Sequence, residues 1–142
     1  MKRLYPKISL YKIERGRLEE CALLLHFPLM TSSLLTGPPP ALEAIGCYKD
    51  KLNDRALPTL YHSFRPYIKW SNLNETIRGC ATVARDMGYE YFGVQYYGEC
   101  WSSENATYTY AKHGVQTKAK ECIANVGGKH TNFVYRILLV SL

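Results

Sequence analysis

The chain has 142 residues, of which 46% are hydrophobic and 21% are charged, and its formal net charge is +6. This length suits one domain, or one smaller domain with a tail, and the composition excludes an intrinsically disordered chain. The positive charges are scattered without a run of five, so nucleic acid is not an expected partner, whereas a mild attraction to acidic polysaccharides or anionic surfaces stays open.

Residues 1–44 are expected to form a leader that ends in a linker. Three consecutive prolines in "TGPPPALEA" exclude a helix or a central strand, so residues 36–44 are predicted to be a semi-rigid linker. Residues 21–35 are largely apolar but too short for a transmembrane span, and they resemble a signal or anchor segment. Any membrane contact would come through this segment. A disordered leader and a misassigned translation start are the alternatives.

A helix is predicted early in the second segment, residues 45–142, which is expected to be one compact domain. Apolar residues recur at three- and four-residue spacing and make one stripe. They are Ile77, Cys80, Ala81, Ala84 and Met87. Asn72 or Asn74 can cap the start of this helix, and Gly88 is a typical residue at which a helix ends.

Strands are predicted on both sides of this helix. From Tyr89 the period changes to two, which predicts a strand with Phe92, Val94 and Tyr96 on one face. Its other face would carry Tyr91, Gly93, Gln95 and Tyr97. Further strands are predicted at residues 44–50 and 132–140, and "TYTY" at 107–110 is either a short edge strand or part of a binding surface. The expected fold class is α+β, with one main helix packed on a short antiparallel sheet.

Four of the five cysteines lie in the compact domain: Cys47, Cys80, Cys100 and Cys122, with Cys21 outside it. Their spacing does not fit a zinc site, so no metal is expected, and two disulfides in an oxidising compartment are favoured over four buried thiols in the cytosol. Cys80 lies on the inward face of the helix and Cys100 ends the following strand. A helix that packs on its own strand brings these two together, which leaves Cys47 to pair with Cys122.

Two sequons agree with an oxidising, extracellular compartment. Asn74 in Asn-Glu-Thr and Asn105 in Asn-Ala-Thr are candidate N-glycosylation sites. Such triplets also occur by chance, and the alternative role of Asn74 is the helix cap.

Several motifs follow one another in a fixed order between residues 45 and 137. They are "GCYKD" (46–50), "RAL" (55–57), "MGYEYFGVQYYGECW" (87–101), Cys122, and "GG" (127–128) leading to "NFVYR" (132–136). In this order they resemble the WSC domain, a small cysteine-rich module of yeast cell-wall stress sensors, polycystin and Kremen receptors. The resemblance implies a WSC/PAN-like fold and the same two disulfides. WSC domains typically carry eight cysteines, and one pair of the family falls here at Ala84 and Ser102. The segment 58–71 is longer than usual for the family.

The resemblance also implies a secreted, non-catalytic module that needs no cofactor and binds polysaccharide or glycoprotein glycans, or mediates matrix adhesion. Sugars stack on aromatic faces while nearby amide and charged groups bind their hydroxyls. The candidate residues for this contact are Tyr89, Tyr91, Gln95, Tyr97, Glu99, Trp101 and Tyr108. The alternative for Trp101 is packing over the adjacent disulfide, and for the tyrosines it is strand packing. A protein-binding or structural module of an extracellular assembly is the alternative function.

Overall fold

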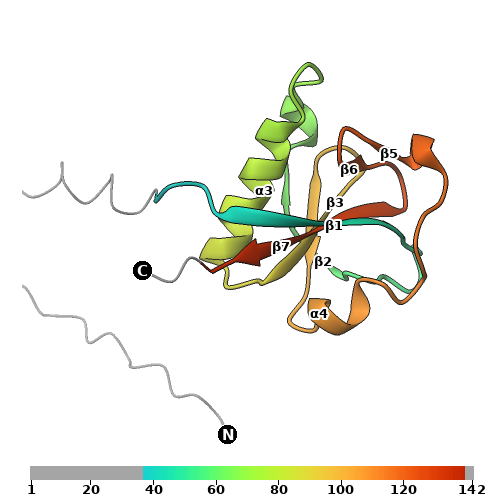
Figure 1. The fold of residues 1–142 in the computed structure, drawn as a ribbon. Helices are drawn as coiled ribbons and strands as arrows, with labels where there is room; N and C mark the ends of the chain where they lie inside the picture. The colour runs from blue at the N-terminus through green and yellow to red at the C-terminus, as the bar shows by residue number, and fades with distance from the viewer. Residues whose placement is uncertain (1–36, 140–142) are drawn as a thin grey trace, which may run out of the picture. The chain divides into compact units, whose positions relative to one another are not determined.

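Five antiparallel strands form the main sheet of the computed structural model, which describes residues 37–139 (Figure 1). Their order across the sheet is β1 (Ala41–Lys49), β7 (Thr131–Leu138), β3 (Tyr91–Gln95), β4 (Glu99–Ser102) and β2 (Thr59–Ser63). A second, two-stranded sheet pairs β5 (Cys122–Ile123) with β6 (Val126–Gly127). The helices are α3 (Asn74–Asp86) and α4 (Ala106–Thr109), with short 3-10 helices η1 (Arg65–Tyr67) and η2 (Ala119–Glu121). The candidate signal or anchor segment and Cys21 lie outside the described residues.

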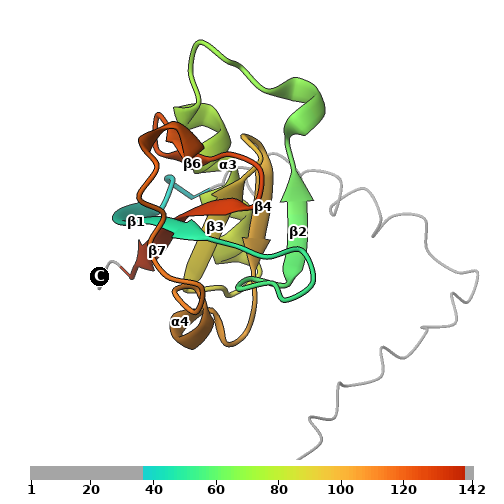
Figure 2. The same ribbon diagram turned by 90° about the vertical axis from the view of Figure 1, so that its right-hand side faces the viewer.

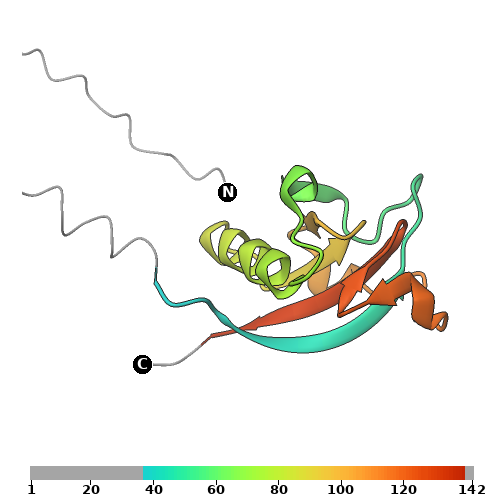
Figure 3. The same ribbon diagram turned by 90° about the horizontal axis from the view of Figure 1, so that it is seen from above.

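The predicted helix is α3, which lies along one face of the sheet (Figure 3). Four residues of its predicted apolar stripe pack on inward-facing strand residues, whereas the fifth, Met87, is 53% exposed at the end of the helix. The core comprises Leu73, Ile77, Cys80, Ala81, Ala84, Phe92, Val94, Cys100, Val126, Tyr135 and Ile137. The helix ends as predicted, because Gly88 adopts φ +79° and the Tyr89 N–H donates to the Ala84 carbonyl at 2.9 Å. Its start differs from the prediction that Asn72 or Asn74 caps it. The N-cap position is occupied by Leu73, and no side chain hydrogen-bonds to the free N–H groups of the first turn. The carbonyl of Asn72 accepts from the Glu75 N–H instead.

The strands predicted at the two ends of the domain pair with each other. β1 runs antiparallel to β7, from Ala41 opposite Leu138 to Lys49 opposite Thr131. The strand expected at residues 44–50 therefore begins earlier, at Ala41, and residues 41–44, which we expected in the linker, form part of the sheet. Hydrogen bonding along β7 stabilises these residues despite the prolines just before them.

The predicted strand from Tyr89 to Tyr97 is in fact the first half of a hairpin. β3 ends at Gln95, and Tyr96 and Tyr97 form a tight turn with φ +49° and +64°. Non-glycine residues rarely adopt this conformation, so no local pattern indicates the turn. Long-range contacts hold it: the N–H groups of Tyr96 and Tyr97 donate to the carbonyls of Gly128 and Gly127 at 3.0 and 2.9 Å. The placement of Tyr96 and Tyr97 on the two strand faces was therefore wrong.

The edge strand β2 and the helix α4 also differ from expectation. β2 pairs with β4 at the edge of the sheet, inside the segment that is longer than usual for the family (Figure 2). The "TYTY" segment, for which an edge strand was one expectation, lies in α4 except for its last residue, and the Tyr108 N–H donates to the Asn105 carbonyl at 2.9 Å. Its local turn hydrogen bonds therefore outweigh the alternating pattern.

Both predicted disulfides are confirmed. Cys47 pairs with Cys122, with their Cα atoms 6.3 Å apart, and ties β1 to β5. Cys80 pairs with Cys100 at a Cα–Cα distance of 5.4 Å and fastens α3 to β4 inside the core. Within residues 37–139, none of the helices has the length and apolar character needed to cross a bilayer.

Candidate functional site

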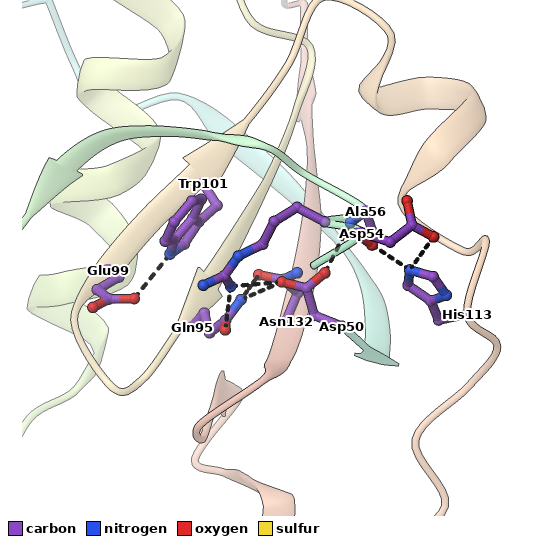
Figure 4. A network of polar contacts seen from close by, with 9 residues as sticks. Asp50, Asp54, Ala56, Gln95, Glu99, Trp101, His113 and Asn132 are labelled. Carbon is purple, nitrogen blue, oxygen red and sulfur yellow. Dashed lines mark hydrogen bonds and ion pairs between the residues drawn. The ribbon is translucent and has the colours of Figure 1, made fainter. Parts of the chain in front are cut away.

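A buried carboxylate organises the face of the sheet opposite α3. Asp50 follows β1, and its side chain is fully buried. Its Oδ2 accepts hydrogen bonds from Arg55 Nη1 and Gln95 Nε2, both at 2.9 Å, and its Oδ1 accepts from the Ala56 N–H at 2.8 Å (Figure 4). A buried carboxylate is costly unless it is paired and hydrogen-bonded, and Asp50 meets both conditions.

Gln95 lies inside this network and not on the surface. Its side chain is only 2% exposed, its Oε1 accepts from Arg55 Nη1 at 2.9 Å, and its amide donates to Asn132 Oδ1 at 3.2 Å. We expected Gln95 to contact a ligand, but its amide group instead bonds to three other side chains of the protein. The strand pattern placed Gln95 on the correct face, and the loop that covers this face could not be foreseen from it.

Gly93 explains why that loop lies so close to the sheet. A Cβ atom at this position would lie 2.7 Å from Asn132 Oδ1 and 2.8 Å from Leu57 Cδ1. The glycine therefore leaves room for the loop after β1, whose Ala56 and Leu57 are fully buried. The loop in turn places the Arg55 guanidinium near β4.

Trp101 lies over Arg55 on the same face. The guanidinium carbon of Arg55 is 4.3 Å from the centre of the indole ring, and Trp101 Nε1 donates to Glu99 Oε2 at 3.0 Å. Successive strand residues point to opposite faces, so Trp101 points away from the disulfide formed by its neighbour Cys100. The alternative in which Trp101 packs over that disulfide does not hold, and the half-buried indole packs on Arg55 instead.

Further aromatic side chains extend this surface past the hairpin turn. Arg65 Nη1 lies 3.8 Å from Glu99 Oε1, and the Arg65 guanidinium carbon is 3.6 Å from the centre of the Tyr96 ring. The rings of Tyr97 and Trp70 are 5.3 Å apart, and Trp70 is 65% exposed. We call this contiguous set the aromatic band, which consists of Arg65, Trp70, Tyr96, Tyr97, Glu99 and Trp101.

Sequence reasoning found three members of the aromatic band and missed the others. Tyr97, Glu99 and Trp101 were predicted, whereas Arg65, Trp70 and Tyr96 were not. The supporting Arg55 was also missed. Arg65 and Trp70 come from the segment 58–71, whose unusual length for a WSC domain was the one available signal.

The remaining candidates lie apart from the aromatic band. Tyr89 and Tyr91 line a groove of about 430 Å³ together with Glu90 and Glu104. Tyr91 stacks on Tyr110 with ring centres 5.5 Å apart, so one of its faces is already covered. Tyr108 lies on α4 and is 86% exposed. The seven candidate residues therefore do not form one site.

Both candidate glycosylation sites are on the surface. Asn74 is exposed at the first position of α3, and Asn105 is exposed immediately before α4. Their modification stays a prediction.

The comparison with known families agrees with the fold and the disulfides. The WSC domain matches residues 44–133, which is more than half of the chain. The chain belongs to the WSC family. A search of the curated proteins found no match. WSC domains are generally non-catalytic binding modules of extracellular or cell-surface proteins, and the two disulfides suit an oxidising compartment.

Proposed function

We propose that this WSC domain is an extracellular carbohydrate-binding or matrix-adhesion module and that the aromatic band contacts the sugar. The observation that carries the proposal is the contiguity of exposed or half-exposed aromatic rings with charged groups on one folded surface. Trp70 is 65% exposed, and Tyr97, Glu99 and Trp101 are each half-buried. Rings of this kind stack against the C–H face of a sugar. The Glu99 carboxylate can accept hydrogen bonds from the sugar hydroxyls, and the Arg65 guanidinium can donate hydrogen bonds to them.

The buried network beneath the band supports binding by fixing the indole in advance. Asp50 and Gln95 orient the Arg55 guanidinium, which in turn packs against Trp101. Side chains that are ordered before binding lose less conformational entropy when the ligand arrives. The band carries one arginine and one glutamate that are 3.8 Å apart, so its charges compensate and it suits a neutral sugar chain.

The chain offers a direct optical test, because it contains two tryptophans and both belong to the aromatic band. Titration with neutral oligosaccharides chosen from a glycan array should change the intrinsic tryptophan fluorescence. Trp70→Ala should weaken binding about tenfold, since truncating an aromatic anchor typically costs about one to two kcal/mol. Tyr108→Ala is the matched control, because Tyr108 is at least as exposed but lies on α4. Unchanged affinity in Trp70→Ala would reject the aromatic band as the site.

Protein binding is the second candidate function, and exposed apolar residues beside the band favour it. Leu60 pairs with Trp101 across β2 and β4 and is 47% exposed, and Tyr67 in η1 is 83% exposed. Apolar surface near aromatic anchors is typical of protein interfaces. Failure of every glycan on the array to bind would favour this candidate.

A further inference from the structure

A second surface lies where β1 ends, and it shares no residue with the aromatic band. It is a groove of about 350 Å³ between the end of β1, the loop that precedes η2 and the residue before β7. We call it the basic groove, and its lining residues are Lys49, Asp50, Lys51, His113, Gln116, Thr117, Lys118 and His130.

The three lysines of the basic groove form no close ion pair within residues 37–139. Lys49, Lys51 and Lys118 are exposed, and none of them lies within 4.0 Å of a carboxylate in this part of the chain. By contrast, Lys69 pairs with Glu75 and Lys112 pairs with Asp54. The three groove lysines therefore present their ammonium groups to solvent.

Two carboxylates at the groove already have partners within the protein. The Asp50 side chain is fully buried and bonded to Arg55, so it points into the fold. Asp54 contacts His113, and a hydrogen bond from Lys112 lowers the pKa of Asp54 below its usual value. Asp54 is thus ionised and forms its close ion pair with Lys112, which lies outside the groove lining, while the more distant Lys51 also lowers the pKa of Asp54.

Backbone hydrogen bonds hold the walls of the groove in place. The Lys49 N–H donates to the Gly114 carbonyl at 3.0 Å, and the Gln116 N–H donates to the Cys47 carbonyl at 2.9 Å. The Asp50 N–H donates to the His130 carbonyl at 2.9 Å. The disulfide of Cys47 anchors the same end of β1. The lysines therefore project from a preformed frame.

We propose that the basic groove binds the sulfate or carboxylate groups of an acidic polysaccharide. Three ammonium groups around one concave site attract anionic groups, and lysine acts there as a compact point charge. Gln116 and Thr117 add side chains that can bond to sugar hydroxyls. No Phe, Tyr or Trp residue lines the groove, so it lacks the large aromatic rings on which single-stranded nucleic acid bases typically stack. An extracellular family also favours a glycan over a nucleic acid. This site is independent of the aromatic band.

The test is a titration with a heparin oligosaccharide, compared with the same oligosaccharide after desulfation. The wild-type chain should bind the sulfated form, with an affinity that falls as salt is raised. Lys51→Gln with Lys118→Gln should raise the Kd about tenfold, because each exposed ion pair contributes modestly. Lys69→Gln with Arg78→Gln removes the same charge from positions elsewhere and should change the Kd less than about threefold. Trp70→Ala should leave this binding unchanged, which separates it from the function of the aromatic band.

Footprinting on the wild-type chain tests the same site without any variant. Bound heparin should protect Lys49, Lys51 and Lys118 from acylation, while Lys69 should react as in the free protein. Equal weakening in both double variants would mean that net charge alone drives binding, and it would overturn the proposal. So would the absence of heparin binding, or equal affinity for a DNA oligonucleotide that protects the same lysines.

Discussion

The Arg55 guanidinium lies 4.3 Å from the centre of the Trp101 ring while one of its nitrogens donates to both Asp50 and Gln95 at 2.9 Å. One side chain therefore connects a fully buried carboxylate to a half-buried aromatic ring on the same face of the sheet. The orientation of Trp101 depends on polar groups in the interior. A change at Arg55 is expected to affect both the stability of the domain and the surface of the aromatic band.

Arg55→Gln should destabilise the fold because it leaves the Asp50 carboxylate buried without its cation. Removing one partner of such a pair typically lowers the free energy of unfolding by about 3–5 kcal/mol. Urea unfolding followed by tryptophan fluorescence measures this change. Asp50→Asn combined with Arg55→Gln removes both charges and should recover part of the loss. A loss below about 1 kcal/mol, as expected for an exposed pair, would contradict the importance of this network.

Gly127 should tolerate no side chain, because β6 lies directly against β3 and β7. A Cβ atom there would overlap the Thr131 carbonyl oxygen and lie 2.8 Å from the Val94 carbonyl oxygen. Both obstacles are backbone atoms, so Gly127→Ala should lower the free energy of unfolding by about 3 kcal/mol or more. The same change should loosen the turn at Tyr97, whose N–H donates to the Gly127 carbonyl.

Gly88→Ala is the matched comparison for Gly127→Ala. Gly88 has φ +79°, but a Cβ atom there meets nothing within 4 Å. Only the left-handed backbone opposes this substitution, which should cost about 1–2 kcal/mol. Thermal unfolding of the two variants would reveal the difference, and equal losses would show that the close packing at Gly127 is relieved by backbone movement.

Local patterns were sufficient for the parts of this fold in which neighbours in sequence determine the structure. The apolar stripe and Gly88 predicted α3 with its end, and the period of two placed Phe92 and Val94 on one strand face, which the structure shows to be the core face. The pairing of Cys80 with Cys100 was predicted from a helix packed on its next strand, and it holds although Cys100 lies on β4, the second strand of the hairpin that follows α3. These features need no knowledge of distant residues.

The aromatic band was only partly predictable because contacts between distant residues create it. The turn at Tyr96 and Tyr97 depends on the carbonyls of Gly127 and Gly128, which come much later in the chain. The buried Gln95 side chain donates a hydrogen bond to Asp50, which is 45 residues earlier in the chain. No periodicity in a single strand reports such partners, and Trp70 joins the band only because its loop reaches Tyr97.

The positions that correspond to a lost family disulfide should still accept one. Ala84 follows Cys80 by one helical turn, and Ser102 follows Cys100 by two strand residues, so both lie on the sides that face each other. Both residues are completely buried. Ala84→Cys with Ser102→Cys is therefore expected to form a third disulfide, detected by peptide mapping without reduction.

The gain in stability from this third disulfide should be small. The Cys80–Cys100 disulfide already links α3 to β4, so the new disulfide closes only a short additional loop. The chain-entropy description gives about 2 kcal/mol of added stability for such a loop. Loss of the hydrogen bond from Ser102 Oγ to the Tyr91 carbonyl offsets about 1 kcal/mol of it. Ala84→Cys alone should keep a free thiol and serves as the control. Two free thiols in the double variant would show that α3 and β4 diverge beyond Cys80.

Burial of Tyr61 should make the domain less stable at alkaline pH. Its hydroxyl donates to the Cys80 carbonyl at 2.9 Å, and burial, with a smaller effect of Tyr89, raises the pKa of Tyr61 far above its ordinary value. Burial also raises the pKa of Tyr135. The unfolded chain loses these protons near a pH of about 10, whereas the folded chain keeps them. The stability is therefore fully present below about pH 10 and falls as the pH rises further, by up to about 1.4 kcal/mol per pH unit for each group.

Phenylalanine variants separate this effect from the lost hydrogen bond. Tyr61→Phe should lower the free energy of unfolding by about 1 kcal/mol at about pH 8 and should flatten its decline above about pH 10. Tyr61→Phe with Tyr135→Phe should flatten the decline further. Urea unfolding between about pH 8 and 11 measures both, in a Cys21→Ser background that prevents thiol exchange with the disulfides. If the double variant loses stability in this range as steeply as the wild type, the alkaline transition arises from groups other than these two phenols.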